Sequence, residues 1–364
     1  MQLIRAAVIA ALGCSMVAAL GAPALADGTL SMRGFYYKEK ATRVIAPMLD
    51  ATFEVGEEDE ADAHALIDAV TSASVASGAQ EGDAFSERRY EVGGGYRHRM
   101  EETLLGGSVR YSHEPDYTSY FAGVQVERAF AEKNTTLGAM ASIGQDSIGS
   151  IGAFGAEMHA GDLTSLIGSL SATQVLSPNT IAGLTYDLAH LDGFLSNPYR
   201  SAITGDGLVP ERNPDERTRH AIAGTVKRFF PETVTTIIAT YRFYADTWDI
   251  EAHTPELRVV QETGDGVDFT VRYRYHRQSA ADFYLPSYPS NDPNLYPYVT
   301  DDVKLSKFTT HTVGVKLGVL GEVLGLPGTL EGARGEIILE YIDQNNRFGN
   351  AVTAHAALTL PFVY

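Results

Sequence analysis

VDFTVRYRYHRQ, the stretch from Val267 to Gln278, alternates apolar and polar side chains along most of its length. One face of an extended chain would carry the apolar set: Val267, Phe269, Val271, Tyr273 and Tyr275. The opposite face would carry the polar set: Asp268, Thr270, Arg272, Arg274, His276 and Gln278. A period of two residues is typical of a β-strand whose faces meet different environments. The stretch therefore predicts a strand with one apolar and one charged face.

The same period recurs along the whole chain, in segments of strand length rather than helix length. In VTTIIATYRFYAD, for example, Ile237, Ala239 and Tyr241 share one face, and Thr240 and Arg242 share the other. These segments predict about sixteen strands, an even number, as bacterial barrels require. The expected strands are Leu30–Tyr37, Thr42–Val55, Ala63–Val75, Ser86–Arg99, Thr103–His113, Ser119–Ala131, Thr135–Gly144, Thr164–Leu176, Thr180–His190, Arg219–Phe230, Val234–Thr247, Ile250–Glu262, Val267–Gln278, Lys307–Val319, Arg334–Ile342 and Ala351–Tyr364.

Two architectures use such alternation, a soluble β-sandwich and an outer-membrane β-barrel. Aromatic side chains near the strand ends favour the barrel, because membrane barrels carry aromatic girdles at both interfaces. The expected girdle residues are Tyr241, Phe243, Tyr273 and Tyr275. No apolar run long enough for a membrane-spanning helix follows the N-terminal segment. The predicted fold class is therefore all-β, a transmembrane antiparallel up-and-down β-barrel.

Connection lengths test this prediction independently, because short periplasmic turns should alternate with longer outside loops. The expected turns AEKN, SPN, FPET and TGDG are tight and rich in turn-forming residues. The expected outside loops are Gln145–Leu163, Leu191–Thr218 and Ser279–Ser306. One connection, Leu320–Ala333, is long although it falls on the periplasmic side. The lengths otherwise alternate as a barrel requires.

The N-terminal segment, residues 1–26, has the pattern of a cleaved secretory signal peptide, which leaves 27–364 as the barrel domain. Arg5 supplies the positive start, an apolar run follows, and Ala24-Leu25-Ala26 fits the small-x-small cleavage rule. The only cysteine, Cys14, lies in the segment to be removed, so we expect no disulfide. The net charge of −18 argues against a nucleic-acid partner. The signal peptide and the barrel pattern together predict export to the bacterial outer membrane, whose lipid would surround the barrel.

Charged residues on the polar faces are expected to line the lumen. The predicted lumen-lining charges are Arg242, Asp246, Arg258, Asp268, Arg272, Arg274, Glu336 and Glu340. A charged wall can set the selectivity of a pore. It can equally form ion pairs that fill a closed lumen, and the sequence leaves this choice open.

Polar residues around three predicted outside turns form a candidate rim binding cluster. Its members are His113, Glu114, Asp116, Trp248, His253, His276, Gln278 and Asp282. Imidazole and carboxylate groups together can bind a cation or a ligand. The spacing fits no standard zinc motif, however, and a network that braces the loops explains the same residues. We expect no metal and no cofactor.

Several stretches resemble the bacterial outer-membrane barrel family catalogued as domain of unknown function 3570. The matching pieces are YYKEKATRV, DAVTSAS, YSHEPDYTS, YRFYADTWDIEAHT and YRYHRQSAADFY. The resemblance covers nearly the whole mature chain. The resemblance implies a barrel in the outer membrane and assigns no established activity. It also implies that the protein works alongside envelope redox proteins.

Two functions are compatible with these features, and neither is enzymatic. The chain has no G-x-S-x-G elbow and no phosphate-binding loop, so we do not expect an enzyme. A porin-like channel for small solutes would account for the charged strand faces. The alternative is a structural or interaction barrel that serves an envelope redox or metal-handling assembly, with a periplasmic partner protein. The rim cluster and the family setting motivate this alternative.

The chain ends within an apolar alternation, TAHAALTLPFVY. Leu358, Leu360, Phe362 and Tyr364 share the predicted lipid face and resemble the signal by which the barrel-assembly machinery recognises its substrates. Deletion of Phe362 to Tyr364 is expected to leave the protein in the periplasm, because the signal at the end of the closing strand is removed. Cell fractionation with heat-modifiability on gels measures this. A normally heat-modifiable barrel in the outer membrane after the deletion would contradict the prediction.

Overall fold

Alternating strands close into a barrel in the computed structural model, which describes residues 27–40, 42–72, 85–151, 157–264 and 266–362. The signal peptide predicted at 1–26 and the final aromatic, Tyr364, lie outside the described residues. The described strands of the barrel number sixteen, as the sequence predicted. They are β1 (Gly28–Lys38), β2 (Thr42–Val55), β3 (Asp59–Ser72), β4 (Phe85–Met100), β5 (Thr103–Glu114), β6 (Tyr117–Phe130), β7 (Thr135–Ile151), β8 (Glu157–Ser177), β9 (Thr180–Gly193), β12 (Glu216–Phe230), β13 (Thr235–Asp246), β14 (Glu251–Glu262), β15 (Val267–Gln278), β16 (Phe308–Leu320), β17 (Arg334–Gln344) and β18 (Ala351–Phe362).

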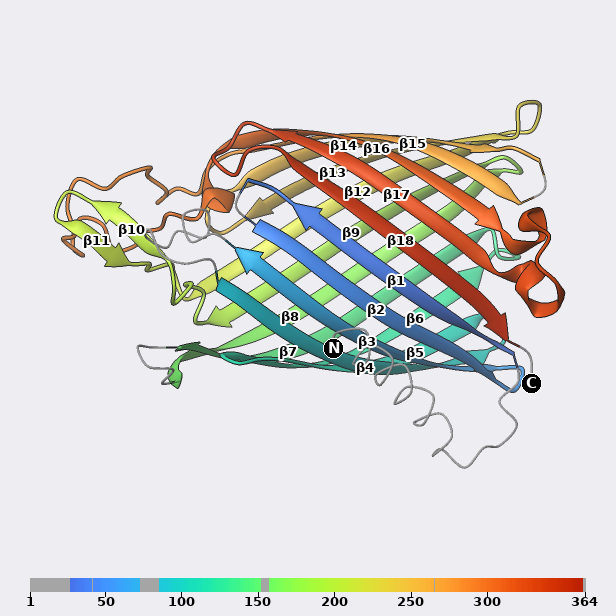
Figure 1. The fold of residues 1–364 in the computed structure, drawn as a ribbon, viewed down its shortest axis with the longest axis horizontal. Coiled ribbons are helices and arrows are strands. Elements are labelled where there is room, and N and C mark those ends of the chain that lie inside the picture. Colours follow the sequence, from blue (N-terminus) through green and yellow to red (C-terminus); the bar gives the residue numbers. More distant parts are fainter. Residues whose placement is uncertain (1–26, 41, 73–84, 152–156, 265, 363–364) are drawn as a thin grey trace.

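Neighbouring strands in the sequence pair antiparallel, and β1 pairs with β18 to close the barrel (Figure 1). The closing register runs from Gly28 opposite Phe362 to Lys38 opposite Val352. Closure leaves no open edge in the described part of the barrel sheet, which a membrane environment requires, since lipid cannot satisfy free backbone groups. The barrel therefore has the architecture that the alternation predicted.

The two ends of the barrel differ in the length of their connections. One end, here called the turn end, carries the end of β18 and the tight connections 131–134, 178–179, 231–234 and 263–266. The predicted short turns all lie there. The long connection after β16 also lies at the turn end and folds into two short 3-10 helices, η3 (Gly321–Leu324) and η4 (Gly328–Gly332). The opposite end, here called the loop end, carries the connections 194–215 and 279–307.

One predicted loop is wrong. Most of Gln145–Leu163 is strand, because β7 runs to Ile151 and β8 begins at Glu157. The pairing continues from Gln145 opposite Thr164 outward, with a register shift between Ile148 and Gly149. Small and polar residues in this segment obscure the alternation of apolar and polar side chains. If the segment were not paired, its backbone N–H and C=O groups would lack hydrogen-bond partners, which is costly. The hairpin therefore extends although its sequence lacks a clear apolar face.

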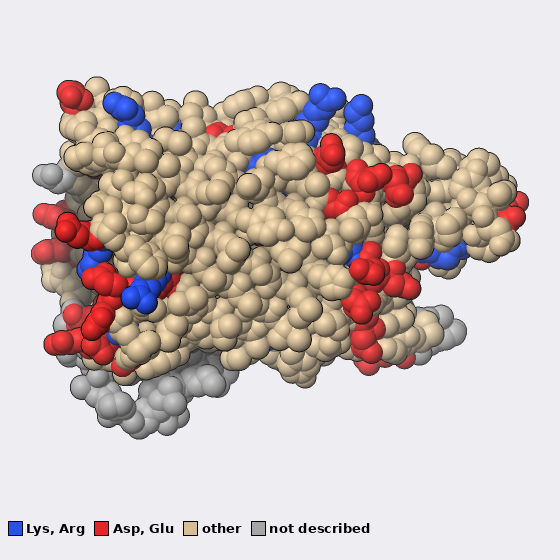
Figure 2. Space-filling model, turned by 180° about the vertical axis from the view of Figure 1, so that it is seen from behind, with Lys and Arg blue, Asp and Glu red and all other residues tan. Residues whose placement is uncertain are grey.

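Side-chain exposure alternates along the strands as the barrel requires. In β15, Val271 is 43% exposed and Thr270 is 8% exposed, so the apolar residue faces outward and the hydroxyl faces inward. On one side of the molecule, charges gather toward the two ends and leave the surface between them almost uncharged (Figure 2). Such a band matches the apolar belt that barrels present to lipid. No helix among the described residues is long and apolar enough to cross a membrane.

The two long connections at the loop end pack against each other and form a folded unit, here called the mouth lobe (194–215 and 279–307). It contains the hairpin β10 (Ser201–Thr204) and β11 (Gly207–Pro210) and the short helix η2 (Val303–Leu305), and it projects beyond the barrel (Figure 1). Its core is made of Ala202, Val209, Tyr288 and Val299. Burial raises the pKa of the Tyr288 phenol. The Tyr288 hydroxyl donates to the Phe283 carbonyl at 3.0 Å.

Candidate functional site

Ion pairs cover part of the inner wall, over β14 to β17. Glu256 accepts from Arg258 Nε at 2.5 Å and from Arg272 Nη2 at 2.7 Å. Arg272 also pairs with Glu340, which lies two strands away. These contacts link three of the predicted lumen charges, Arg258, Arg272 and Glu340, into one group with Glu256. The group neutralises most of its own charge and stiffens the wall.

A second ion-pair group lies nearer the turn end. Glu336 accepts from Lys316 Nζ at 2.6 Å and from Arg334 Nε at 2.9 Å. Arg334 also pairs with Asp268. The structure therefore brings the predicted charges Asp268 and Glu336 together through Arg334, a residue that the sequence analysis did not select.

Two predicted lumen arginines remain without a carboxylate partner. Neither Arg242 nor Arg274 has a carboxylate oxygen within 4.0 Å among the described residues. Arg242 instead lies over the ring of Tyr244, with its Cζ 5.6 Å from the ring centroid. Uncompensated cations on a lumen wall give it a positive potential.

Asp246 anchors the loop end of β13 and is fully buried, with its side chain 0% exposed. It accepts from Arg217 Nε at 3.0 Å and from the Tyr244 hydroxyl at 2.5 Å. Its other oxygen accepts the backbone N–H groups of Trp248, at 2.9 Å, and Ile250, at 3.1 Å. The carboxylate therefore fixes the β13–β14 turn and compensates the charge of Arg217.

The predicted rim cluster divides between the two faces of the barrel. His113 and His253 lie on the outer face, where they contact the hydroxyls of Thr118 at 3.0 Å and Tyr241 at 2.6 Å. His276 points inward and contacts the Thr254 hydroxyl at 2.9 Å. No group of three metal-ligating side chains gathers anywhere in the described part of the chain.

Three other members of the cluster brace the mouth lobe. Gln278 is buried and donates to the carbonyls of Lys304 and Ser306, at 2.8 Å each. Trp248 packs edge-on against Phe283, at 5.3 Å between ring centroids. Asp282 is exposed, and its backbone N–H donates to the Trp248 carbonyl at 3.0 Å. These contacts agree with the bracing network that the sequence analysis weighed against a binding site.

The remaining two members, Glu114 and Asp116, line a cavity of about 500 Å³ inside the loop end, together with Trp248. One wall comes from β4 to β7 and the opposite wall from β12 and the mouth lobe. The lining residues are Arg89, Glu114, Asp116, Tyr117, Ile148, Gly149, Leu195, Ser196, Asn197, Pro198, Tyr199, Arg200, Asn213, Arg217, Arg219, Trp248, Asp302 and Leu305.

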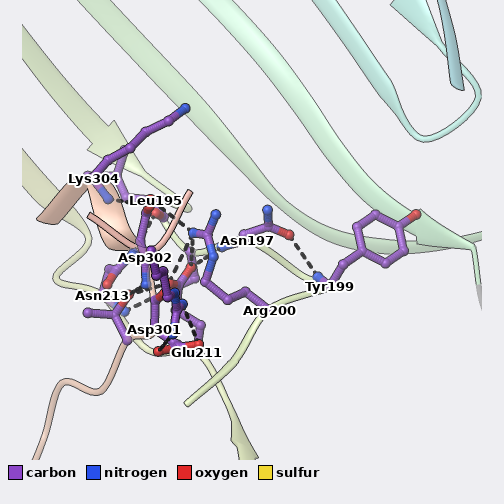
Figure 3. Close-up of polar contacts among 12 residues, drawn as sticks. Leu195, Asn197, Tyr199, Arg200, Glu211, Asn213, Asp301, Asp302 and Lys304 are labelled. Atoms are coloured by element: carbon purple, nitrogen blue, oxygen red, sulfur yellow. Dashed lines mark hydrogen bonds and ion pairs between the residues drawn. The ribbon is translucent and has the colours of Figure 1, made fainter. Parts of the chain in front are cut away.

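A strap of the mouth lobe, residues 195–200, forms part of this cavity wall and is held at both ends. Arg200 Nη1 pairs with Glu211 Oε1 at 3.2 Å and Asp302 Oδ2 at 3.0 Å (Figure 3). Glu211, whose side chain is 0% exposed, also accepts from the Asn197 backbone at 2.6 Å. Tyr199 reaches the β5–β6 turn, where its hydroxyl contacts Asp116.

The arginines of this cavity were not predicted from the sequence. Arg217 and Arg219 occupy alternate positions in the stretch ERTRH, and this alternation could have placed both on the inner face of β12. Arg200 and Glu211 carry no periodic signal, because the fold of the mouth lobe brings them together. Only the structure could identify them.

The C-terminal strand is placed as predicted. In β18, Leu358 is exposed on the outer face with Leu360 and Phe362 at alternate positions, and Thr359 contacts Ser31 on the inner face at 2.8 Å. Recognition of this strand by an assembly machinery stays a prediction.

Solved structures share this fold at low sequence identity. A bacterial polysaccharide outer membrane secretin is 8% identical, with a TM-score of 0.52 over 93% of this chain and 98% of that chain. OprD from Pseudomonas aeruginosa is 10% identical, with a TM-score of 0.48 over 93% and 95%. At these values the first likeness establishes an outer-membrane barrel fold and nothing about the solute.

A family model gives the chain its classification. No curated protein sequence matches the chain. The model for the family described as "Protein of unknown function (DUF3570)" matches residues 81–345. This match covers most of the barrel, from β4 to β17, and agrees with the resemblance found in the sequence motifs. The chain therefore belongs to the DUF3570 family of outer-membrane β-barrel proteins.

Proposed function

We propose that the protein is a porin-like channel for small solutes in the bacterial outer membrane. The supporting observation is that charged side chains on the inner wall remain exposed to solvent. The side chains of Arg33, Arg110 and Arg258 face inward and are 45%, 55% and 46% exposed. Inside a closed barrel, such exposure requires water-accessible space. Sixteen strands enclose enough room for an aqueous channel.

The inner wall favours charged or polar solutes. Most of its ion pairs run along the wall, as between Glu256 and Arg272, rather than across the lumen. The unpaired Arg242 and Arg274 add positive potential on one side. A charged constriction selects solutes by sign as well as size. Along this part of the wall, the two positive charges are expected to favour small anions over cations of the same size.

The orientation follows from the connection lengths. Barrels place short turns in the periplasm and long loops outside the cell. The turn end is therefore proposed to face the periplasm, and the mouth lobe the medium. Export through the 1–26 signal peptide and assembly through the C-terminal strand complete this proposal.

Planar-bilayer recording of the purified full chain is expected to show stepwise conductance, because the proposed channel would hold water from end to end. Current in a potassium chloride gradient would give the anion preference from the reversal potential. A heat-denatured sample serves as the control. Absence of conductance at every salt concentration and pH would overturn the proposal and favour a closed structural barrel.

A further inference from the structure

Buried polar atoms without a partner concentrate at the cavity inside the loop end. Among the described residues, six buried side-chain atoms have no hydrogen-bond partner: Asp68 Oδ1, Arg89 Nε, Ser112 Oγ, Ser142 Oγ, Asn213 Oδ1 and Arg219 Nε. Three of these, on Arg89, Asn213 and Arg219, belong to residues that line this one cavity. Buried polar groups in folded proteins are nearly always hydrogen-bonded. The concentration of exceptions points to a ligand that supplies the missing partners.

The charge of Arg219 is the one that most needs a partner. Its neighbour Arg217 pairs with Asp246, and Arg200 pairs with Glu211 and Asp302. Arg89 pairs with Asp68 at 3.3 Å. No carboxylate oxygen within the described ranges lies within 4.0 Å of Arg219. Arg219 is therefore a cavity-lining cation that makes no ion pair within the described part of the chain.

The donor and acceptor pattern defines the ligand further. The Arg219 guanidinium offers hydrogen-bond donors in a planar fork, which suits a carboxylate with its two oxygens. The orphaned Oδ1 of Asn213 is an acceptor and needs a donor such as a hydroxyl. Ile148 and Leu195 add apolar surface for a carbon skeleton. The cavity volume of about 500 Å³ lies within the range of small-molecule sites.

We propose that this cavity binds a small hydroxylated carboxylate, with the carboxylate on Arg219 and a hydroxyl on Asn213. The proposal deepens the proposed function, since it names the class of solute that the channel receives at its mouth. Binding itself needs no conduction, so the two can be tested separately.

Trp248 provides a direct readout of binding, because it lines the cavity and is the only tryptophan in the chain. Its ring lies 4.1 Å from the Arg217 Cζ. Gluconate added to the purified full-length barrel is expected to change the Trp248 fluorescence saturably. Sorbitol, which has the same carbon number and no carboxylate, is expected to leave it without a saturable change. An equal response to inorganic phosphate would overturn the assignment to carboxylates.

Arg219→Gln is expected to weaken gluconate binding at least about tenfold, because the variant cannot make a charge-assisted bidentate bond to the carboxylate. Arg219→Lys keeps the charge without the fork and is expected to bind with intermediate affinity, which guards against misfolding of Arg219→Gln. Arg110→Gln, an exposed inner-wall arginine outside the cavity, serves as the matched control and is expected to stay within about twofold of the parent. Unchanged affinity in Arg219→Gln would overturn the site.

Failure of the site and failure of the channel give different results. A barrel that conducts ions but shows no saturable gluconate response refutes the site and leaves the channel. A barrel that binds gluconate through Arg219 but conducts nothing supports the site and refutes the channel.

Discussion

Replacing Asp246 by alanine is expected to unfold the loop end while the barrel stays closed. The buried carboxylate accepts hydrogen bonds from Arg217, Tyr244 and two backbone N–H groups of the β13–β14 turn. Its removal leaves the Arg217 guanidinium without its carboxylate partner, although the Arg217 side chain is only 10% exposed. Breaking a buried pair by removing one partner costs about 3–5 kcal/mol. We expect the destabilisation to fall on the mouth lobe, because the barrel wall retains its ladder of backbone hydrogen bonds.

Two measurements separate the lobe from the barrel. Denaturant titration followed by Trp248 fluorescence reports the loop end, and heat-modifiability on gels reports the barrel. Asp282→Ala removes an exposed carboxylate from the same end and serves as the matched control, with an expected change within about 0.5 kcal/mol. If Asp246→Ala shifted the fluorescence transition no more than Asp282→Ala, the anchoring role of Asp246 would be wrong.

The sequence predicted the barrel because membrane strands repeat one simple rule. Each strand must alternate, since one face meets lipid and the other meets the lumen, and VDFTVRYRYHRQ follows this rule through most of β15. The extended β7–β8 hairpin was missed because its outer part is made mainly of small and polar residues, while the pairing itself is made by backbone groups, which leave no pattern in the sequence. Alternation therefore predicts the parts that cross the membrane better than the parts beyond it.

Site residues on membrane strands could be predicted from the same alternation, and those in loops could not. Arg242, Arg258, Arg272 and Arg274 lie on strands, so their period placed them on the inner wall. His253 was expected at the rim but lies on the outer face. It precedes the inward-facing Thr254 in β14, and successive residues of a strand point to opposite faces. The pairing of Arg200 with Asp302 depends on how two separate loops fold together, since the two residues are 102 positions apart in the sequence. No local pattern encodes such a pairing.

Replacing Arg242 and Arg274 together by glutamine is expected to remove most of the anion preference of the channel. Both side chains lie on the inner wall without a carboxylate partner among the described residues, so their charges act on passing ions. Screened by water and salt, the pair contributes about 1 kcal/mol to the discrimination between chloride and potassium. This corresponds to about a fivefold change in the permeability ratio. The reversal potential in a potassium chloride gradient measures it.

The matched control is the double variant Arg128→Gln with Arg228→Gln, because it also removes two positive charges, but from the outer face. Each of these arginines lies over a phenylalanine ring, Phe130 at 5.5 Å and Phe230 at 5.3 Å, much as Arg242 lies over Tyr244. The control therefore changes the net charge by the same amount, disturbs a similar cation–π pair, and differs in the face of the wall. If both double variants shifted the reversal potential equally, the selectivity would come from the overall charge of the protein and not from its lumen. If neither shifted it, Arg242 and Arg274 would not face the conducting path.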